Sequence, residues 1–332
     1  MKTKVLLIGP AYFNYNYSIA SAFDPQKFEV RIIDYSEQFG RNTWYNKISY
    51  FFSKNKKTTT EKLQANLNKY IIEIYNHYRP ELVFFIKGDC VFTETVLNMK
   101  QSKKILWMLD GISYYPLSLK LVDKMDAVFL FEKSDVEEVI KLNENAFYLP
   151  PSFDDQIFKK LQLKKDIDIL FIGVLYDSRI KLLEKLHASF PQLKMKFYCK
   201  RFWFYRTPLM FIKSLTDNTF INRFVTPTEA NNLYNRAKVC LNMHHVQSVY
   251  GINPRFFEIL GANALQFVDY KPFIEENFAK YNIQMYKTEE ELFKLIHQQF
   301  SDNSQQDNHM LFDNVSIHHT YKNRIEFILG KL

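Results

Sequence analysis

The run Asp168-Ile169-Leu170-Phe171-Ile172-Gly173 is an apolar segment of strand length that ends at a glycine. It follows the helix-breaking sequence Leu149-Pro150-Pro151 and a polar link, Ser152–Lys165. On both sides of this interruption, short apolar runs alternate with stretches of helical periodicity. Near-continuous apolar strands separated by helices are typical of parallel sheets that are covered on both faces. The sequence therefore predicts two doubly wound α/β domains in tandem, each Rossmann-like.

The individual elements follow from the same patterns. Strands are expected at Lys4–Ile8, Phe28–Asp34, Leu82–Lys87, Ile105–Leu109, Ala127–Glu132, Ile167–Ile172, Lys194–Tyr198, Val239–Met243 and Leu265–Val268. Helices are expected at Tyr17–Phe23, Glu61–Tyr78, Val136–Leu142, Ile180–Phe190, Thr228–Ala237, Pro254–Leu260 and Ile317–Leu329. We place the domains at residues 1–155 and 156–315, and residues 316–332 form a final helix that is a candidate to cross back to the first domain.

Composition excludes several classes of protein. The chain has 332 residues, of which 47% are hydrophobic and 24% charged, as in an ordinary globular protein with a full core. No apolar stretch approaches the roughly 20 residues that a bilayer requires. The 3 cysteines are scattered, which favours a reducing cytoplasm over a disulfide scaffold. The start, Met1–Gly9, predicts a first strand rather than a signal peptide.

The net charge of +8 favours an anionic partner. Two segments, Asn42–Lys57 and Lys194–Lys213, mix basic with aromatic residues. Such a mixture suits peripheral contact with an anionic membrane surface. It equally suits loops that pack aromatic rings on the core while the lysines stay in water. No nucleic-acid partner is predicted.

Candidate site residues of the first domain follow its strands, because ligands bind beyond the carboxyl ends of open parallel sheets. Gly9 ends the first strand, and Asn14 and Tyr15 line the loop after it. Gly9 is read either as a tight strand–helix turn or as part of a ligand-facing loop. Asp110 ends another strand and is a candidate general base or acceptor-positioning group. The alternative for Asp110 is an Asx turn.

The second domain offers a candidate anion site across the expected cleft. Gly173 would let a bound group approach the backbone and the next helix N-terminus, where phosphates bind. Arg179 could add a bidentate phosphate contact or be a solvated helix residue. His244 could contact a bound phosphate, but His244 and its neighbour His245 would point to opposite sides and are a poor metal pair. Asp166-Ile167-Asp168 precedes its strand, so no metal site is predicted there.

The stretch Asn253-Pro254-Arg255-Phe256-Phe257-Glu258, followed by small residues, an apolar strand and Asp269-Tyr270-Lys271-Pro272, resembles the donor-binding segment of CgeB-type spore-maturation glycosyltransferases. The likeness continues downstream through His319-Thr320-Tyr321-Lys322-Asn323-Arg324 and upstream through the Asp168–Gly173 strand. It covers residues 165–330 well and 1–150 loosely. The resemblance implies a GT-B fold, with two domains facing a cleft and a nucleotide-diphosphate sugar as donor.

The resemblance also implies roles for individual residues. Glu258 would accept hydrogen bonds from ribose hydroxyls, while Asn253 and Arg255 would hold the donor, with Arg255 meeting the diphosphate and stabilising the leaving group. Read alone, Arg255 and Glu258 are an ordinary helix-start pair. Asn263 replaces the usual glycine after the donor helix and tolerates left-handed geometry. Tyr250 stands where a related family has a first carboxylate, so Glu258 would act alone.

The resulting hypothesis is a cytoplasmic, metal-independent glycosyltransferase without a cofactor. It would move a sugar onto a glycan or lipid-linked acceptor in bacterial surface polysaccharide or glycoconjugate synthesis, with peripheral attachment to the membrane left open. One alternative is a non-catalytic GT-B-like scaffold at the membrane surface. The other is a nucleotide-sugar epimerase, which shares the fold.

Overall fold

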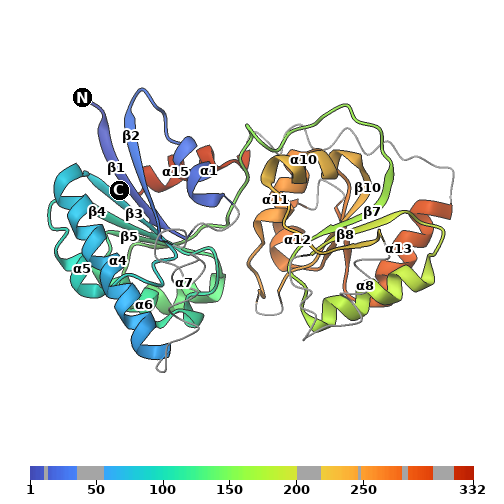
Figure 1. The fold of residues 1–332 in the computed structure, drawn as a ribbon, viewed down its shortest axis with the longest axis horizontal. Coiled ribbons are helices and arrows are strands. Elements are labelled where there is room, and N and C mark those ends of the chain that lie inside the picture. Colours follow the sequence, from blue (N-terminus) through green and yellow to red (C-terminus); the bar gives the residue numbers. More distant parts are fainter. Residues whose placement is uncertain (11–13, 36–55, 200–217, 246–247, 279–282, 302–317) are drawn as a thin grey trace. The chain divides into compact units, whose positions relative to one another are not determined.

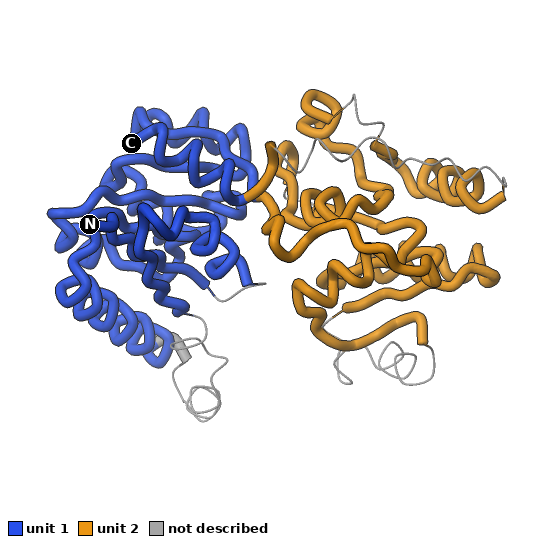
Figure 2. Tube along the Cα trace, turned by 90° about the horizontal axis from the view of Figure 1, so that it is seen from above, with its two compact units in different colours: residues 1–151, 321–332 blue, residues 152–320 orange. Residues whose placement is uncertain are grey.

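The computed structural model describes residues 1–10, 14–35, 56–199, 218–245, 248–278, 283–301 and 318–332. The chain forms two compact units: unit 1 comprises Met1–Pro151 with Tyr321–Leu332, and unit 2 comprises Ser152–Thr320 (Figure 2). Each unit contains one six-stranded sheet, with helices connecting the strands (Figure 1). Most of the two basic and aromatic segments, Asn42–Lys57 and Lys194–Lys213, lies outside the described residues, which leave out 36–55 and 200–217. The predicted doubly wound α/β architecture is confirmed.

In unit 1 the strand order is β2-β1-β3-β4-β5-β6, and every neighbouring pair is parallel. The strands are β1 (Thr3–Gly9), β2 (Phe28–Asp34), β3 (Leu82–Ile86), β4 (Lys103–Trp107), β5 (Ala127–Leu130) and β6 (Ala146–Tyr148). The α-helices are α1 (Tyr15–Ser21), α4 (Lys56–Tyr78), α5 (Thr93–Leu97), α6 (Pro116–Leu119), α7 (Lys133–Val139) and α15 (Tyr321–Leu329). Two short 3-10 helices, η1 (Ile112–Tyr114) and η2 (Val122–Lys124), flank α6.

The central strands of unit 1 are apolar on both faces because both faces are covered. All five residues of β3 are buried: Val83 and Phe85 pack into one core cluster, while Leu82, Phe84 and Ile86 pack into the other. The second of these clusters also contains three residues of α15, at a spacing that repeats along one helix face: Tyr321, Ile325 and Ile328. The end of the chain is therefore part of the core of unit 1.

In unit 2 the strand order is β12-β11-β10-β7-β8-β9, again with parallel neighbours throughout. The strands are β7 (Ile167–Ile172), β8 (Met195–Tyr198), β9 (Phe220–Ile221), β10 (Ala237–Asn242), β11 (Gln266–Asp269) and β12 (Gln284–Tyr286). The α-helices are α8 (Asp177–Ser189), α10 (Pro227–Arg236), α11 (Pro254–Gly261), α12 (Pro272–Phe278) and α13 (Glu289–Ser301). No helix of the described residues is long and apolar enough to cross a membrane.

The polar link that precedes β7 is held along α10 by two buried asparagines. Asn231 Oδ1 accepts a hydrogen bond from the Lys159 amide at 3.1 Å. Asn235 Oδ1 accepts one from the Leu161 amide at 2.7 Å, and its Nδ2 donates to the Lys159 carbonyl at 3.0 Å. An irregular segment needs such partners because its backbone groups lack a ladder.

Gly261, at the end of α11, allows a close approach that a side chain would prevent. A Cβ atom at this position would lie 2.5 Å from Cε2 of Phe153, whose side chain is 1% exposed. We expect Gly261→Ala to lower the free energy of unfolding of unit 2 by roughly 1–3 kcal/mol, the usual cost of overpacking a core. Urea denaturation followed by fluorescence would measure this loss.

The control is Gly330→Ala, because the nearest atom to its added Cβ is a backbone oxygen at 3.4 Å and the site is exposed. Equal stabilities of Gly261→Ala and Gly330→Ala would contradict the packing argument.

Candidate functional site

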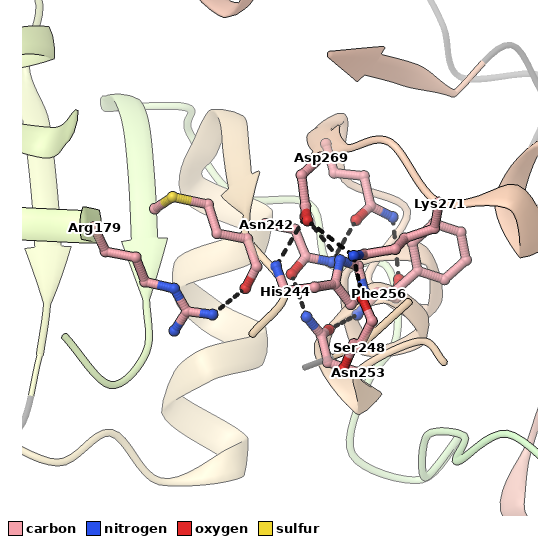
Figure 3. A network of polar contacts seen from close by, with 10 residues as sticks. Arg179, Asn242, His244, Ser248, Asn253, Phe256, Asp269 and Lys271 are labelled. Carbon is pink, nitrogen blue, oxygen red and sulfur yellow. Dashed lines mark hydrogen bonds and ion pairs between the residues drawn. The ribbon is translucent and has the colours of Figure 1, made fainter. Parts of the chain in front are cut away.

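The carboxyl edge of the unit 2 sheet carries a buried guanidinium. Arg179 lies in the first turn of α8, and its side chain returns to the sheet instead of extending into solvent. Its Nη1 donates to the Val174 carbonyl at 2.8 Å. Its Nη2 donates to the Met243 carbonyl at 2.6 Å (Figure 3). Arg179 is only 9% exposed, so the solvated-helix interpretation is wrong. Burial lowers its pKa, and the charge of Arg255 lowers it further.

A second guanidinium, that of Arg255, lies close enough for this repulsion. Arg255 is partly buried, and its Nε is buried with no hydrogen-bond partner among the described residues. Among the described residues, neither Arg179 nor Arg255 forms an ion pair with a carboxylate. Two neighbouring guanidinium groups that lack a direct ion pair repel each other, and an anion bound between or beside them would relieve this repulsion. Their arrangement defines a candidate anion site.

The first turn of α11 is fixed beside these cations by a closed ring of hydrogen bonds (Figure 3). Asn253, the N-cap, accepts from the Phe256 amide at 3.0 Å and donates to Asn242 Oδ1 at 2.9 Å. Asn242 Nδ2 donates to Gln266 Oε1 at 3.2 Å, and Gln266 Nε2 donates to the Phe256 carbonyl at 3.1 Å. Asn242 is 0% and Gln266 2% exposed. The ring holds the N-terminus of α11 at the carboxyl edge of β10, where the positive end of the helix dipole favours an anion.

Glu258 follows Arg255 by nearly one turn of α11 and is partly buried. Its Oε2 accepts a hydrogen bond from the hydroxyl of Tyr234, on α10, at 3.3 Å. Burial raises the pKa of the Glu258 carboxyl, although the charge of Arg255 and the Tyr234 hydrogen bond act in the opposite direction. Its other oxygen has no partner within the described residues and is available to a hydroxyl group.

His244 follows β10 and forms a buried pair with Asp269, at the end of β11. The distance from its Nδ1 to Asp269 Oδ1 is 2.7 Å, and its backbone amide donates to the same oxygen at 2.8 Å. A carboxylate can only accept, so Nδ1 carries the proton. Burial lowers the pKa of His244, although Asp269 opposes this, so the ring is neutral and Nε2 is an acceptor. That Nε2 is buried without a partner in the described chain.

The remaining predicted residues of unit 2 are placed differently. At Gly173 a Cβ would lie 2.8 Å from Cζ of Phe171, so packing within the sheet is sufficient reason for this glycine. Asn263 has a φ of 53°, the left-handed geometry that the sequence indicated. It lies just beyond the C-terminal end of α11, whose 8 residues extend about 12 Å along the helix axis away from Asn253. The structure therefore does not bring Asn263 to the carboxyl edge.

In unit 1, the first βα loop is tight. A Cβ on Gly9 would lie 2.5 Å from Asn16 Oδ1 and 2.8 Å from Ile86 Cβ, which supports the turn interpretation of this glycine. Asn14 precedes α1 with a φ of 66°, and Tyr15 packs against the core. Residues 11–13 of the same loop lie outside the described chain.

Asp110 lies beyond the carboxyl end of β4, with a side chain that is 42% exposed. Its Oδ2 is 3.3 Å from Nζ of Lys87 and accepts a hydrogen bond from the hydroxyl of Tyr115 at 3.2 Å. Within the described residues its carboxylate accepts no backbone amide, so the Asx turn is not formed. Asp110 instead belongs to a charged cluster at this edge.

Several of these partners carry no signal in the sequence. Asn242, Gln266 and Tyr234 lie within strands or helices, where nothing in the pattern separates them from ordinary residues. Lys87 does have a signal: it follows the apolar run of β3 directly, as Asp110 follows that of β4. Among the described residues no group of three or more His, Cys, Asp or Glu side chains could hold a metal ion.

Comparison with known proteins agrees with this architecture. Residues 179–330 match the profile of a family described as glycosyl transferase-like. Sucrose-phosphate synthase from Thermosynechococcus elongatus is similar, with 12% identity, a TM-score of 0.64 and 99% of each chain covered. Anabaena HepE in complex with UDP and glucose has 10% identity and a TM-score of 0.64, covering 99% of this chain and 100% of that one.

A Listeria monocytogenes protein described as a UDP-N-acetylglucosamine 2-epimerase is similar as well, with 11% identity, a TM-score of 0.61, and coverage of 99% of this chain and 96% of that one. No curated protein sequence matches this chain. Together these likenesses establish a GT-B fold with a glycosyl transferase-like C-terminal region.

Loss of the Asn253 side chain removes a helix cap and also leaves the buried Asn242 Oδ1 without its hydrogen-bond donor. We expect Asn253→Ala to lower the free energy of unfolding by about 2 kcal/mol, more than the roughly 1 kcal/mol of a simple cap. Urea denaturation checks this expectation. The control is Thr226→Ala on α10, where the side chain only caps, accepting from the Glu229 amide at 3.3 Å. Equal losses would show that the ring contributes nothing beyond the cap.

The lowered pKa of His244 predicts a pH dependence of stability. In the unfolded chain histidine has its ordinary pKa near 6.5, so below that pH the unfolded state takes up a proton that the folded state does not. The contribution of neutral His244 to the free energy of unfolding is therefore complete above a pH of about 6.5. It is lost as the pH falls below that value, by at most about 1.4 kcal/mol per pH unit. Urea denaturation at several pH values should show a smaller decline for His244→Asn than for the wild type. The same substitution at the exposed His297 should leave the decline unchanged.

Proposed function

We propose that this chain is a glycosyltransferase whose unit 2 binds a nucleotide-diphosphate sugar. The observation that carries the proposal is the pair of guanidinium groups, Arg179 and Arg255, which form no ion pair with a carboxylate of the described residues and lie beside the N-terminus of α11. A diphosphate matches this site because it supplies two negative charges and several hydrogen-bond acceptors. The GT-B fold raises the expectation of such a donor without establishing it.

Each group at the unit 2 edge has a chemical role in this proposal. Arg255 stabilises the charge that develops on the diphosphate as the bond to the sugar breaks, while Arg179, held by backbone carbonyls, contributes positive potential. The free oxygen of Glu258 accepts from a ribose hydroxyl. Asn253 holds the helix in position, and His244 Nε2 offers an acceptor to the sugar or the nucleotide.

Solved structures with the same fold support this donor class. Anabaena HepE was crystallised with UDP and glucose, and starch synthase IV from Arabidopsis thaliana with ADP and acarbose. Those ligands belong to those proteins, and for this chain they indicate only that the proposed class suits the fold. In the proposal the charge of the leaving group is neutralised by side chains, so turnover should persist in excess EDTA.

Unit 1 supplies the acceptor side in this proposal, with Asp110 as the group that meets the acceptor hydroxyl and Gly9, Asn14 and Tyr15 lining the adjacent loop. A glycan or lipid-linked acceptor of bacterial surface polysaccharide is the class that the CgeB-type resemblance favours. Contact with an anionic membrane would involve the basic and aromatic segments, most of which lies outside the described residues.

A nucleotide-sugar epimerase is the second candidate, favoured by the likeness to the Listeria protein and by the His244–Asp269 pair at the site. Incubation with UDP-N-acetylglucosamine alone separates the two functions. Inversion at C2 of the sugar, seen by NMR, would identify an epimerase, whereas transfer to an added acceptor identifies a transferase. A non-catalytic scaffold would do neither.

Nucleotide binding is tested by thermal shift with UDP, GDP, ADP, CMP and dTDP. A ligand at about 100 times its Kd adds about 2.7 kcal/mol of stability, which raises Tm measurably. We expect one base to raise the Tm of the wild type, and Arg255→Gln and Glu258→Ala each to weaken the affinity by tenfold or more.

The matched control is Arg223→Gln, since Arg223 pairs with Glu229 on an exposed surface of the same unit. A full shift in Arg255→Gln, or no shift from any nucleotide in the wild type, would contradict the proposal.

A further inference from the structure

The turn after β3 brings a lysine over the carboxyl edge of unit 1. Lys87 has a φ of 69° and is followed by Gly88 with a φ of 68°. The Lys87 amide donates to the Trp107 carbonyl at 2.9 Å, which ties this turn to the end of β4. A left-handed conformation is unfavourable for a residue with a Cβ, so at Lys87 it persists only because its surroundings require it.

The Lys87 ammonium is surrounded by partners that compensate for its burial. Its side chain is 11% exposed, and Nζ lies 3.3 Å from Asp110 Oδ2, 3.8 Å from Asp89 Oδ2 and 4.1 Å from the centroid of the Tyr115 ring. Burial alone would lower the pKa of Lys87, but Tyr115, Asp110 and Asp89 outweigh it and raise the pKa. Lys87 is therefore a permanent cation between two carboxylates.

The two carboxylates are used differently. Asp89 has both oxygens occupied, since Oδ1 accepts from the hydroxyl of Tyr35 and Oδ2 faces Lys87. Asp110 has both of its contacts, from Lys87 and from Tyr115, on Oδ2. Its Oδ1 has no partner among the described residues. Asp110 is also the more exposed, at 42% against 23% for the side chain of Asp89.

We propose that Lys87 and Tyr115 are positioning residues that hold Asp110 by one oxygen, so that its Oδ1 accepts the hydrogen bond and then the proton of the acceptor hydroxyl. The inference rests on the proposed function and adds two residues to it. In the step, the hydroxyl oxygen forms a bond to the anomeric carbon of the donor sugar. The bond from that carbon to the diphosphate oxygen breaks, its electron pair leaves with the nucleoside diphosphate, and the proton passes to Asp110 Oδ1.

A two-point hold on one oxygen is what a general base requires. A carboxylate on a loop rotates about χ1 and χ2, whereas contacts from two directions to Oδ2 restrict both rotations and leave Oδ1 directed away from them. A misplacement of about 1 Å in such a group can cost on the order of 100-fold in rate. Removing the contact of Lys87 or of Tyr115 to Asp110 should therefore change kcat rather than the binding of the donor.

The test compares Lys87→Met, Lys87→Arg, Tyr115→Phe and Asp110→Asn in the full chain. The matched control is Lys104→Met, because Lys104 at the opposite end of β4 pairs with Asp126 at 3.6 Å with similar exposures, 18% and 43%. The probes are UDP-glucose, ADP-glucose and GDP-mannose, chosen by the base that shifts the Tm, with release of nucleoside diphosphate to water as the readout. Water takes the place of the acceptor hydroxyl in this assay.

We expect Lys87→Met and Tyr115→Phe to lower kcat by about 10- to 100-fold with the donor KM within twofold. Lys87→Arg keeps the charge and should restore most of kcat, and Asp110→Asn should show the largest loss. Lys104→Met should match the wild type. An unchanged kcat in Lys87→Met, or an equal loss in Lys104→Met, would overturn the inference.

The change in Tm on adding nucleotide distinguishes failure of this inference from failure of the proposed function. Lys87→Met should retain the full wild-type Tm shift, because the donor residues are in unit 2. Absence of a shift in the wild type overturns the proposed function. A wild-type shift without diphosphate release from any probe overturns the assignment of Asp110 and its two positioning residues, and leaves nucleotide binding standing.

Discussion

The parallel arrangement of every strand pair is the constraint on which both units depend. Because parallel neighbours require a crossover between them, the chain returns to the same side of the sheet before each strand, and within each unit all carboxyl ends meet at one edge. Residues far apart in the chain therefore become neighbours wherever strands end. Lys87 and Asp110 follow adjacent strands of unit 1, and His244 and Asp269 follow or end adjacent strands of unit 2. The candidate sites are consequences of this edge more than of any local motif.

Buried polar groups at the unit 2 edge are of two kinds. In the ring through Asn242, Asn253 and Gln266, each amide finds a partner, so the ring rigidifies the start of α11 at little net cost. By contrast, Arg255 Nε and His244 Nε2 are buried with no partner in the described chain. An unsatisfied buried group costs roughly 1–3 kcal/mol, a cost that a bound ligand can remove. The hydrogen-bonded amides hold the site in place. The atoms without a partner mark the positions at which a hydrogen bond to a ligand would add most to the binding free energy.

The regular elements were largely predictable. The sequence predicts β2 at Phe28–Asp34 and β7 at Ile167–Ile172, the bounds that the structure has. It does not predict β6, β9 or β12, because a strand of two or three residues at a sheet edge has too little periodicity to detect. The α13 helix, with an acidic first turn, was missed although its pattern is helical. Boundaries elsewhere differ by a few residues, since helix ends depend on capping and packing.

By itself, the sequence determined the two α/β units, the start of a helix near Pro254 and the placing of Arg255 and Glu258 in one turn of that helix, because apolar periodicity and short-range spacing are local properties. Only the tertiary structure decided that Arg179 turns back to carbonyls of the sheet, that Asn263 lies away from the other predicted residues, and that Lys87 holds one oxygen of Asp110. Those contacts join residues on separate strands and loops, and their geometry is set by strand order and turn conformation, which no local pattern encodes.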